Sequence, residues 1–166
     1  MKKKKPATEE NYDEKKKENS VTFMYFNRFL MLRYFTAFMF FTNIYWFGMA
    51  CMLKSWTAVI PGLLALGGIA VTIELTSKLH TKKGEVPVSK CYYAVQSIVN
   101  VAIIIVSFTP AYDAFFPFLK NQGQIFVIII ALAGLVMSLL VFRRIRQIEE
   151  EKDRQLKVIK MFEKNN

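Results

Sequence analysis

Long apolar segments alternate with short polar ones between residues 34 and 142. Four such segments are each about 20 residues long and share one charged side chain, that of Glu74; they cover 34–53, 57–76, 91–110 and 123–142. An α-helix rises about 1.5 Å per residue, so roughly 20 residues cross the ~30 Å hydrocarbon core of a bilayer. Over such a length in lipid, a helix satisfies all of its own backbone hydrogen bonds. The pattern predicts an all-α integral membrane protein whose residues 34–142 form a four-transmembrane-helix bundle.

The flanking segments are rich in charge and differ in their apolar content. Residues 1–19 have few apolar side chains and many charges of both signs, which predicts a disordered tail. Residues 20–33 combine Phe and Leu with two arginines, which favours a juxtamembrane amphipathic helix. Residues 143–166 space their apolar side chains by three or four and place opposite charges four apart, which predicts a C-terminal cytoplasmic helical extension.

The positions of the basic residues predict the topology. Lys and Arg outnumber Asp and Glu by nine to five in residues 1–33, by four to one in 76–90 and by eight to five from 143 onwards. Four spans put these three segments on the same side of a membrane, and the positive-inside rule makes that side the cytoplasm. We therefore expect both termini to be cytoplasmic (N-in/C-in), with a bacterial plasma membrane as the setting.

The net charge of +10 also bears on the partners of the chain. A nucleic-acid-binding protein gathers its basic residues on one face, whereas here they are divided among the flanks of four apolar segments. The distribution predicts no nucleic-acid partner. It favours contact with the bilayer itself, including the anionic lipids of its inner leaflet.

Glu74 is the one acidic residue inside an apolar segment. It lies two residues before the polar stretch that follows the second span, which places its carboxylate close to the membrane boundary. Lys78 follows four residues later on the same helix face, in the favourable order of acid before base. We expect a boundary ion pair between Glu74 and Lys78; the alternative is a carboxylate that responds to protons or cations, because acids within a membrane are often functional.

Three amide side chains form a second candidate site. Asn43 and Asn100 lie near the middle of the first and third segments, and Gln96 is one helical turn from Asn100 on the same face. The two segments run in the same direction, so we expect the amides at a common depth near the membrane midplane. Such amides either hold helices together by hydrogen bonds or line a binding site of the kind found in transporters.

Catalytic chemistry has little support in the sequence. The single histidine, His80, stands in a basic loop without a neighbouring acid or cysteine and is expected to be a solvated loop residue. No motif for a nucleophile, a phosphate or a metal ion is present, so we predict no enzyme activity, no cofactor and no metal.

Two functions remain open. The charged ends and the absence of a strongly charged membrane interior favour an accessory, regulatory or protective subunit that docks on a larger membrane complex. The alternative is a small oligomeric transporter or channel that uses the midplane amides. Either reading implies another membrane protein, or a second copy of this chain, as the partner.

Overall fold

The computed structural model describes residues 7–81, 84–119, 123–150, 152 and 154–165, and all regular structure within these ranges is helical. The elements are α1 (Ala7–Arg28), α2 (Leu30–Met52), the 3-10 helix η1 (Trp56–Ala58), α3 (Val59–Thr81), α4 (Pro87–Ser107), α5 (Tyr112–Phe115), α6 (Gln124–Glu149) and α7 (Arg154–Asn165). Four of them, α2, α3, α4 and α6, are long and apolar enough to cross a membrane. The predicted number of membrane-length helices is confirmed within the described residues.

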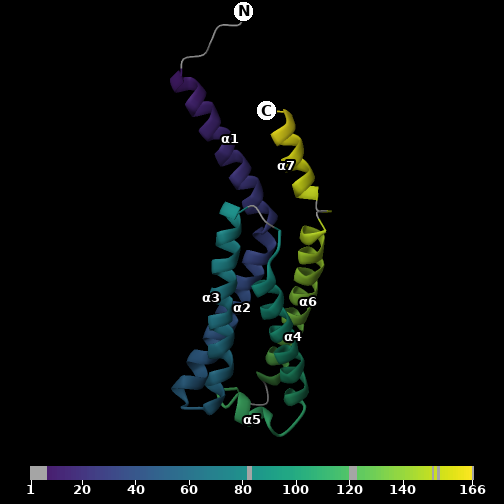
Figure 1. Cartoon of the computed structure of the whole chain (residues 1–166). Helices are drawn as coiled ribbons and strands as arrows, with labels where there is room; N and C mark the ends of the chain where they lie inside the picture. Colours follow the sequence, from purple (N-terminus) through teal and green to yellow (C-terminus); the bar gives the residue numbers. More distant parts are fainter. Residues whose placement is uncertain (1–6, 82–83, 120–122, 151, 153, 166) are drawn as a thin grey trace, which may run out of the picture.

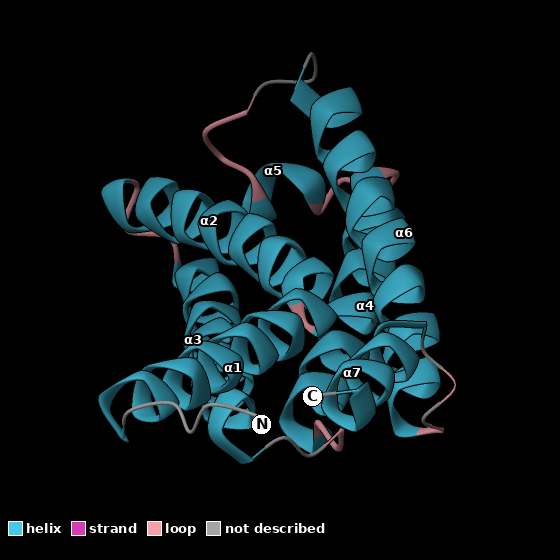
Figure 2. Ribbon diagram, turned by 90° about the horizontal axis from the view of Figure 1, so that it is seen from above, coloured by secondary structure: helices cyan, strands magenta, loops and turns pink. Residues whose placement is uncertain are grey.

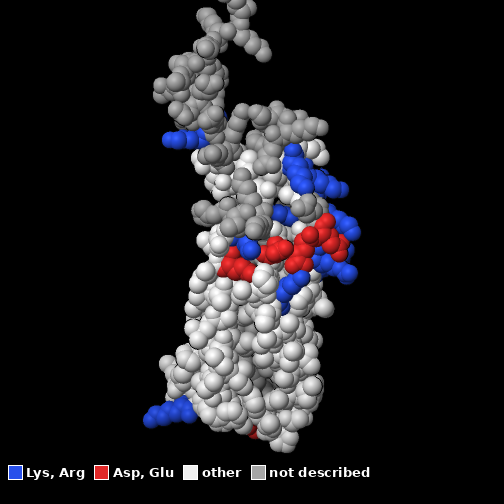
Figure 3. All heavy atoms as spheres, viewed as in Figure 1, with Lys and Arg blue, Asp and Glu red and all other residues white. Residues whose placement is uncertain are grey.

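The four long helices lie alongside one another as a bundle (Figure 1). The helices α2 and α3 pack as one hairpin, α4 and α6 as another, and α3 joins them by packing on α4, whereas α2 and α6 touch sparsely. At one end, α1 and α7 extend beyond the bundle and contact each other. Lys, Arg, Asp and Glu gather there above a largely uncharged surface (Figure 3). We call this the basic end, because Lys and Arg outnumber Asp and Glu in the segments that lie there. The opposite end, which carries η1 and α5, is the aromatic end.

Small residues let the helices approach closely. A Cβ atom added to Gly67 of α3 would lie 2.8 Å from Cδ2 of Tyr92 on α4, and one added to Gly134 of α6 would overlap the side-chain amide of Asn100. Neither position tolerates a larger side chain without movement of its neighbour. Glycine here serves close helix packing, as is common in bundles of apolar helices.

The main apolar core occupies the half of the bundle nearer the basic end. Its largest fully buried side chain is that of Tyr93, whose hydroxyl is 2.9 Å from Oγ1 of Thr36 and donates to the carbonyl oxygen of Leu32 at 3.3 Å. The buried apolar members of this core are Phe29, Leu32, Met39, Val71, Leu75, Val86, Tyr92, Tyr93, Val141, Ile145 and Ile148.

The N-terminal segment differs from the predicted tail and juxtamembrane helix. Helix α1 begins at Ala7, where disorder was predicted through residue 19, and the predicted helix 20–33 is divided at Phe29. Lys, Glu and Ala are good helix formers, so the charged composition does not oppose a helix. Val21 and Tyr25 of α1 pack against Leu156 and Ile159 of α7. This contact joins segments far apart in the sequence, so local sequence patterns do not predict it.

The C-terminal extension is helical but interrupted. Helix α6 ends at Glu149, and α7 begins at Arg154. The interruption permits Leu156 and Ile159 to be buried against α1, at 5% and 1% exposure.

Candidate functional site

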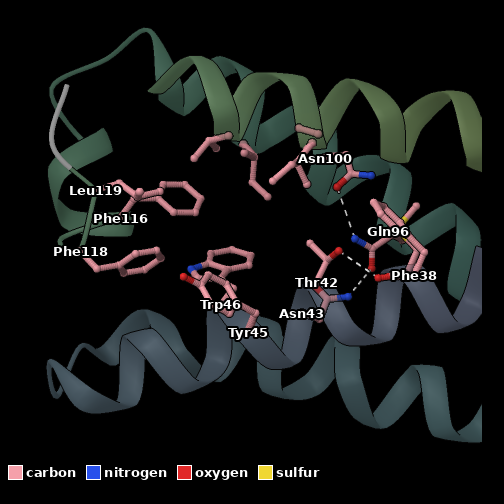
Figure 4. A pocket seen from close by; sticks show the side chains of 15 residues that line it. Phe38, Thr42, Asn43, Tyr45, Trp46, Gln96, Asn100, Phe116, Phe118 and Leu119 are labelled. Carbon is pink, nitrogen blue, oxygen red and sulfur yellow. Dashed lines mark hydrogen bonds between the residues drawn. The ribbon is translucent and has the colours of Figure 1, made fainter. Parts of the chain in front are cut away.

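The three predicted amides lie together in a hydrogen-bonded chain. Asn43 of α2 donates from Nδ2 to Oε1 of Gln96 at 3.1 Å, and Gln96 donates from Nε2 to Oδ1 of Asn100 at 3.3 Å (Figure 4). All three side chains are buried, with exposures of 3%, 4% and 5% for Asn43, Gln96 and Asn100. The chain joins one hairpin of the bundle to the other.

Helix α6 shapes the far end of this amide chain. Gly134 leaves the space that the Asn100 amide occupies, and Nδ2 of Asn100 has no hydrogen-bond partner among the described residues. An unpaired buried amide nitrogen costs free energy, on the order of 1–3 kcal/mol. The amides therefore bond to one another between α2 and α4, and Nδ2 of Asn100, next to α6, is the donor that has no partner among the described residues.

A cavity of about 100 Å³ begins at the amide chain and extends toward the aromatic end. The helices α2, α4 and α6 form its walls. Phe116, Phe118 and Leu119, which follow α5 and with it make up the α5 segment, form its far end (Figure 4). None of its lining residues is charged; they are Phe38, Met39, Thr42, Asn43, Tyr45, Trp46, Gln96, Asn100, Ile103, Phe116, Phe118, Leu119, Val127, Ile130 and Ala131. The cavity suits an uncharged, largely apolar occupant.

Aromatic side chains close the far end of the cavity. Phe116 stacks on Trp46 with ring centroids 5.1 Å apart, and Tyr112 lies 5.6 Å from Phe116. Phe116 is buried at 5% exposure because the loop that carries it folds into the space between α2 and α6 (Figure 2). The Trp46 Nε1 and the Tyr112 hydroxyl have no partner among the described residues. Burial raises the pKa of Tyr112, and the neighbouring Asp113 raises it further, so the hydroxyl stays protonated at neutral pH.

The side of the cavity between α2 and α6 is bordered by exposed side chains. Ile130 of α6 is 43% exposed. On α2, four aromatic residues spaced by four, three and four positions share one face, with exposures of 67%, 41%, 68% and 67% for Tyr34, Phe38, Phe41 and Tyr45. We call these four residues the α2 aromatic stripe. Two of them, Phe38 and Tyr45, also line the cavity, so the stripe and the cavity form one continuous surface.

Glu74 binds the beginning of α4. Its Oε1 accepts from the backbone N–H of Val88 at 3.0 Å, and its Oε2 accepts from the N–H and the hydroxyl of Ser89 at 2.8 and 2.7 Å. A helix N-terminus has unsatisfied N–H groups and a partial positive charge, and a carboxylate meets both. No ion pair joins Glu74 to Lys78, two residues that the structure describes. Glu74 bonds to the N–H groups of Val88 and Ser89 in place of Lys78, because these groups lie within hydrogen-bonding distance of its carboxylate.

Further contacts that sequence reasoning missed join the helices at the basic end. Arg33 of α2 donates to the carbonyl oxygen of Leu75 on α3 at 2.9 Å, and Arg28 of α1 donates to that of Ile148 on α6 at the same distance. Lys90 of α4 pairs with Glu149 of α6 at 2.6 Å. A basic residue near a predicted helix end is the only sequence signal for such contacts, and it does not identify the helix that is contacted.

The described residues offer no candidate metal site. They contain no group of three His, Cys, Asp or Glu side chains placed to hold a metal ion. The side chain of His80 lies outside the described part of the structure.

Comparison with known proteins assigns no family. No protein-family model matches the chain, and neither a curated protein nor a solved structure is significantly similar to it. The function has to be argued from the geometry of the chain itself.

We predict that Gly134→Ala displaces the Asn100 amide and breaks the bond to Gln96. Overpacking of this kind costs about 1–3 kcal/mol, so the melting temperature of the purified protein in detergent should fall. Gly48→Ala is the matched control, because nothing lies within 4 Å of the added Cβ atom. Adding Asn100→Ala to Gly134→Ala should restore part of the loss. An unchanged melting temperature in Gly134→Ala would contradict the close contact.

A second prediction separates the two roles of Glu74. Glu74→Gln removes the charge and weakens the cap of α4, at a cost of about 0.5–2 kcal/mol, so the Val88 and Ser89 amides should exchange hydrogen faster. Lys78→Gln should leave their exchange unchanged, since the cap does not involve Lys78. Equal effects of the two substitutions on melting temperature and exchange would favour the ion pair instead.

Proposed function

We propose that the chain is a non-catalytic membrane protein that docks on a larger membrane complex as an accessory or regulatory subunit. The surface that docks is the α2 aromatic stripe with the adjoining cavity, and its partner is a transmembrane helix of another protein. The observation that carries this proposal is the continuity of an exposed aromatic face with an uncharged cavity between α2 and α6.

The side chains of this surface fit a helix as the occupant. Aromatic residues at four-three-four spacing present a ridge that packs between the side chains of a neighbouring helix. The cavity next to the ridge has room for one or a few projecting side chains. Trp46 and Asn100 line this cavity, and each has a buried N–H group without a partner among the described residues. Large aromatic anchors of this type dominate binding energy at protein interfaces.

The same geometry is less suited to moving a solute. The cavity has no charged lining residue, its amides bond mainly to each other, and Phe116 and Trp46 close it toward the aromatic end. Solute pathways need polar groups that exchange bonds with the solute along their length. The amides of Asn43 and Gln96 accordingly act as contacts between helices.

The distribution of charge supports a topology for this docking protein. The basic end, with both termini and the α3–α4 loop, is assigned to the cytoplasm by the positive-inside rule, and the aromatic end to the other side of a bacterial plasma membrane. Exposed Tyr34 and Tyr45 then lie toward the two interfaces, where tyrosine is enriched.

A small oligomeric transporter or channel is the second candidate. The observation that favours it is the unpaired Nδ2 of Asn100, next to a cavity that amide oxygens and nitrogens border at one end. A second copy of the chain would have to complete the pathway. In that case, purified protein in liposomes would conduct a solute, and Asn43→Leu with Asn100→Leu would abolish the flux.

We predict that Phe41→Ala with Tyr45→Ala releases the partner. A tagged chain extracted from native membranes in mild detergent should retain a second protein at fixed stoichiometry, measured by the mass of the intact complex. Loss of two aromatic anchors should lower the retained fraction roughly tenfold or more. Ile98→Ala with Ile105→Ala is the control, because these side chains are 69% and 61% exposed on α4. A homo-oligomer with no second protein would contradict the proposal.

The topology has its own prediction. Asp113 in α5 and Glu85 in the α3–α4 loop are both exposed at opposite ends of the bundle. With Cys51→Ser and Cys91→Ser as background, a membrane-impermeant maleimide should label Asp113→Cys in intact cells. It should label Glu85→Cys only after the cells are permeabilised. The reverse order would overturn the assignment of the basic end to the cytoplasm.

A further inference from the structure

A groove of about 520 Å³ lies at the basic end, where α1 meets α2 beside the end of α6. Its lining combines arginines, amides and apolar side chains, contributed by Asn27, Arg28, Leu30, Met31, Leu140, Arg143, Arg144, Gln147 and Gln155. It is separate from the cavity described above and shares no lining residue with it.

The groove concentrates positive charge. Three of its lining residues are arginines, and none is Asp or Glu. Two described carboxylates near the end of α6 bind elsewhere: Glu149 pairs with Lys90, and Glu150 pairs with Arg146 and Lys152. Arg143 is exposed and forms no ion pair within the described residues. Like charges held together favour the binding of an anion.

Two of the three guanidinium groups are held in place by neutral acceptors. Arg28 is only 2% exposed and donates to the carbonyl oxygen of Ile148 at 2.9 Å. Arg144 donates to Oε1 of Gln155 at 2.9 Å and to the carbonyl oxygen of Arg28 at 3.4 Å. These bonds orient both side chains, and Arg144 pairs with no carboxylate within the described residues, so little conformational entropy is lost when an anion binds there.

The groove also spans the change from apolar to charged surface. Leu140 is followed by Arg143 one turn later on α6, and Leu30 and Met31 begin α2, separated from Arg28 only by Phe29. An occupant therefore meets arginines on one side and aliphatic side chains on the other. A small inorganic anion would contact only the arginines and leave the aliphatic side chains uncovered.

We propose that this groove binds the headgroup of an anionic phospholipid. The phosphodiester oxygens accept hydrogen bonds from Arg143 and Arg144, and an acyl chain lies along Leu30, Met31 and Leu140. Guanidinium groups match phosphate oxygens in geometry, and basic pockets between helices at the cytoplasmic side of membranes favour anionic lipids. The lipid would bridge α6 and the α1–α2 junction. The inference is independent of the docking surface on α2 and α6.

The test uses the full chain in mixed micelles that contain equal amounts of phosphatidylglycerol and phosphatidylcholine. Native mass spectrometry counts the lipids that stay bound. We expect phosphatidylglycerol to be retained in preference, and Arg143→Gln to weaken its binding about fivefold, as the loss of one basic residue near a membrane surface implies. Arg143→Lys should lose less, because it keeps the charge.

Arg146→Gln is the matched control, since Arg146 is one turn away on the same helix but pairs with Glu150 outside the groove. It should leave lipid binding unchanged, and both glutamine variants should keep the parent melting temperature. Equal losses in the two variants would show diffuse attraction and overturn the site. Equal retention of the two lipids would also overturn it. Displacement of the lipid by excess inorganic phosphate would identify a free-anion site in place of a lipid site.

Discussion

The ends of the helices at the basic end are joined by hydrogen bonds to their neighbours, and the shape of the molecule depends on this. Each helix end leaves backbone groups without intrahelical partners. Glu74 meets those of α4, and Arg28 bonds the carbonyl oxygen of Ile148 in the last turn of α6. Arg33 bonds the carbonyl oxygen of Leu75 six residues before the end of α3, which joins α2 to α3. At the aromatic end, by contrast, the space between α2 and α6 is filled by aromatic residues of the α5 segment. Hydrogen bonds between helices join the basic end of the bundle, and the cavity lies toward the aromatic end.

That asymmetry gives the amides and the aromatic residues different roles. Asn43, Gln96 and Asn100 bond to one another where the helices are close, and their polarity is largely used within the bundle. The aromatic stripe of α2 remains exposed on a helix that contacts α6 only sparsely. An uncharged cavity beside an exposed aromatic ridge supports recognition of another membrane helix more than passage of a solute. The arginine groove lies at the opposite end and adds a separate surface that is suited to an anionic lipid.

Much of the bundle was predictable because helix length and register are local properties. The four apolar segments predict the four long helices, and the common depth of Asn43 and Asn100 predicts their proximity. The partner of Glu74 was not predictable, because Lys78 is close in sequence whereas Ser89 becomes close only after α3 packs on α4. The burial of Phe116 and the turn before α7 depend likewise on contacts between distant segments. The sparse contact between α2 and α6, beside which the cavity lies, has no signature in hydrophobic periodicity.

The most direct measurement of the docking proposal is site-specific photocrosslinking in native membranes. A photoreactive phenylalanine analogue at position 41 lies in the α2 aromatic stripe, and the same analogue at position 98 lies on the exposed face of α4. The account predicts one discrete adduct with a different membrane protein from position 41 and none from position 98. Adducts from both positions alike, or an adduct of the chain only with itself, would contradict it.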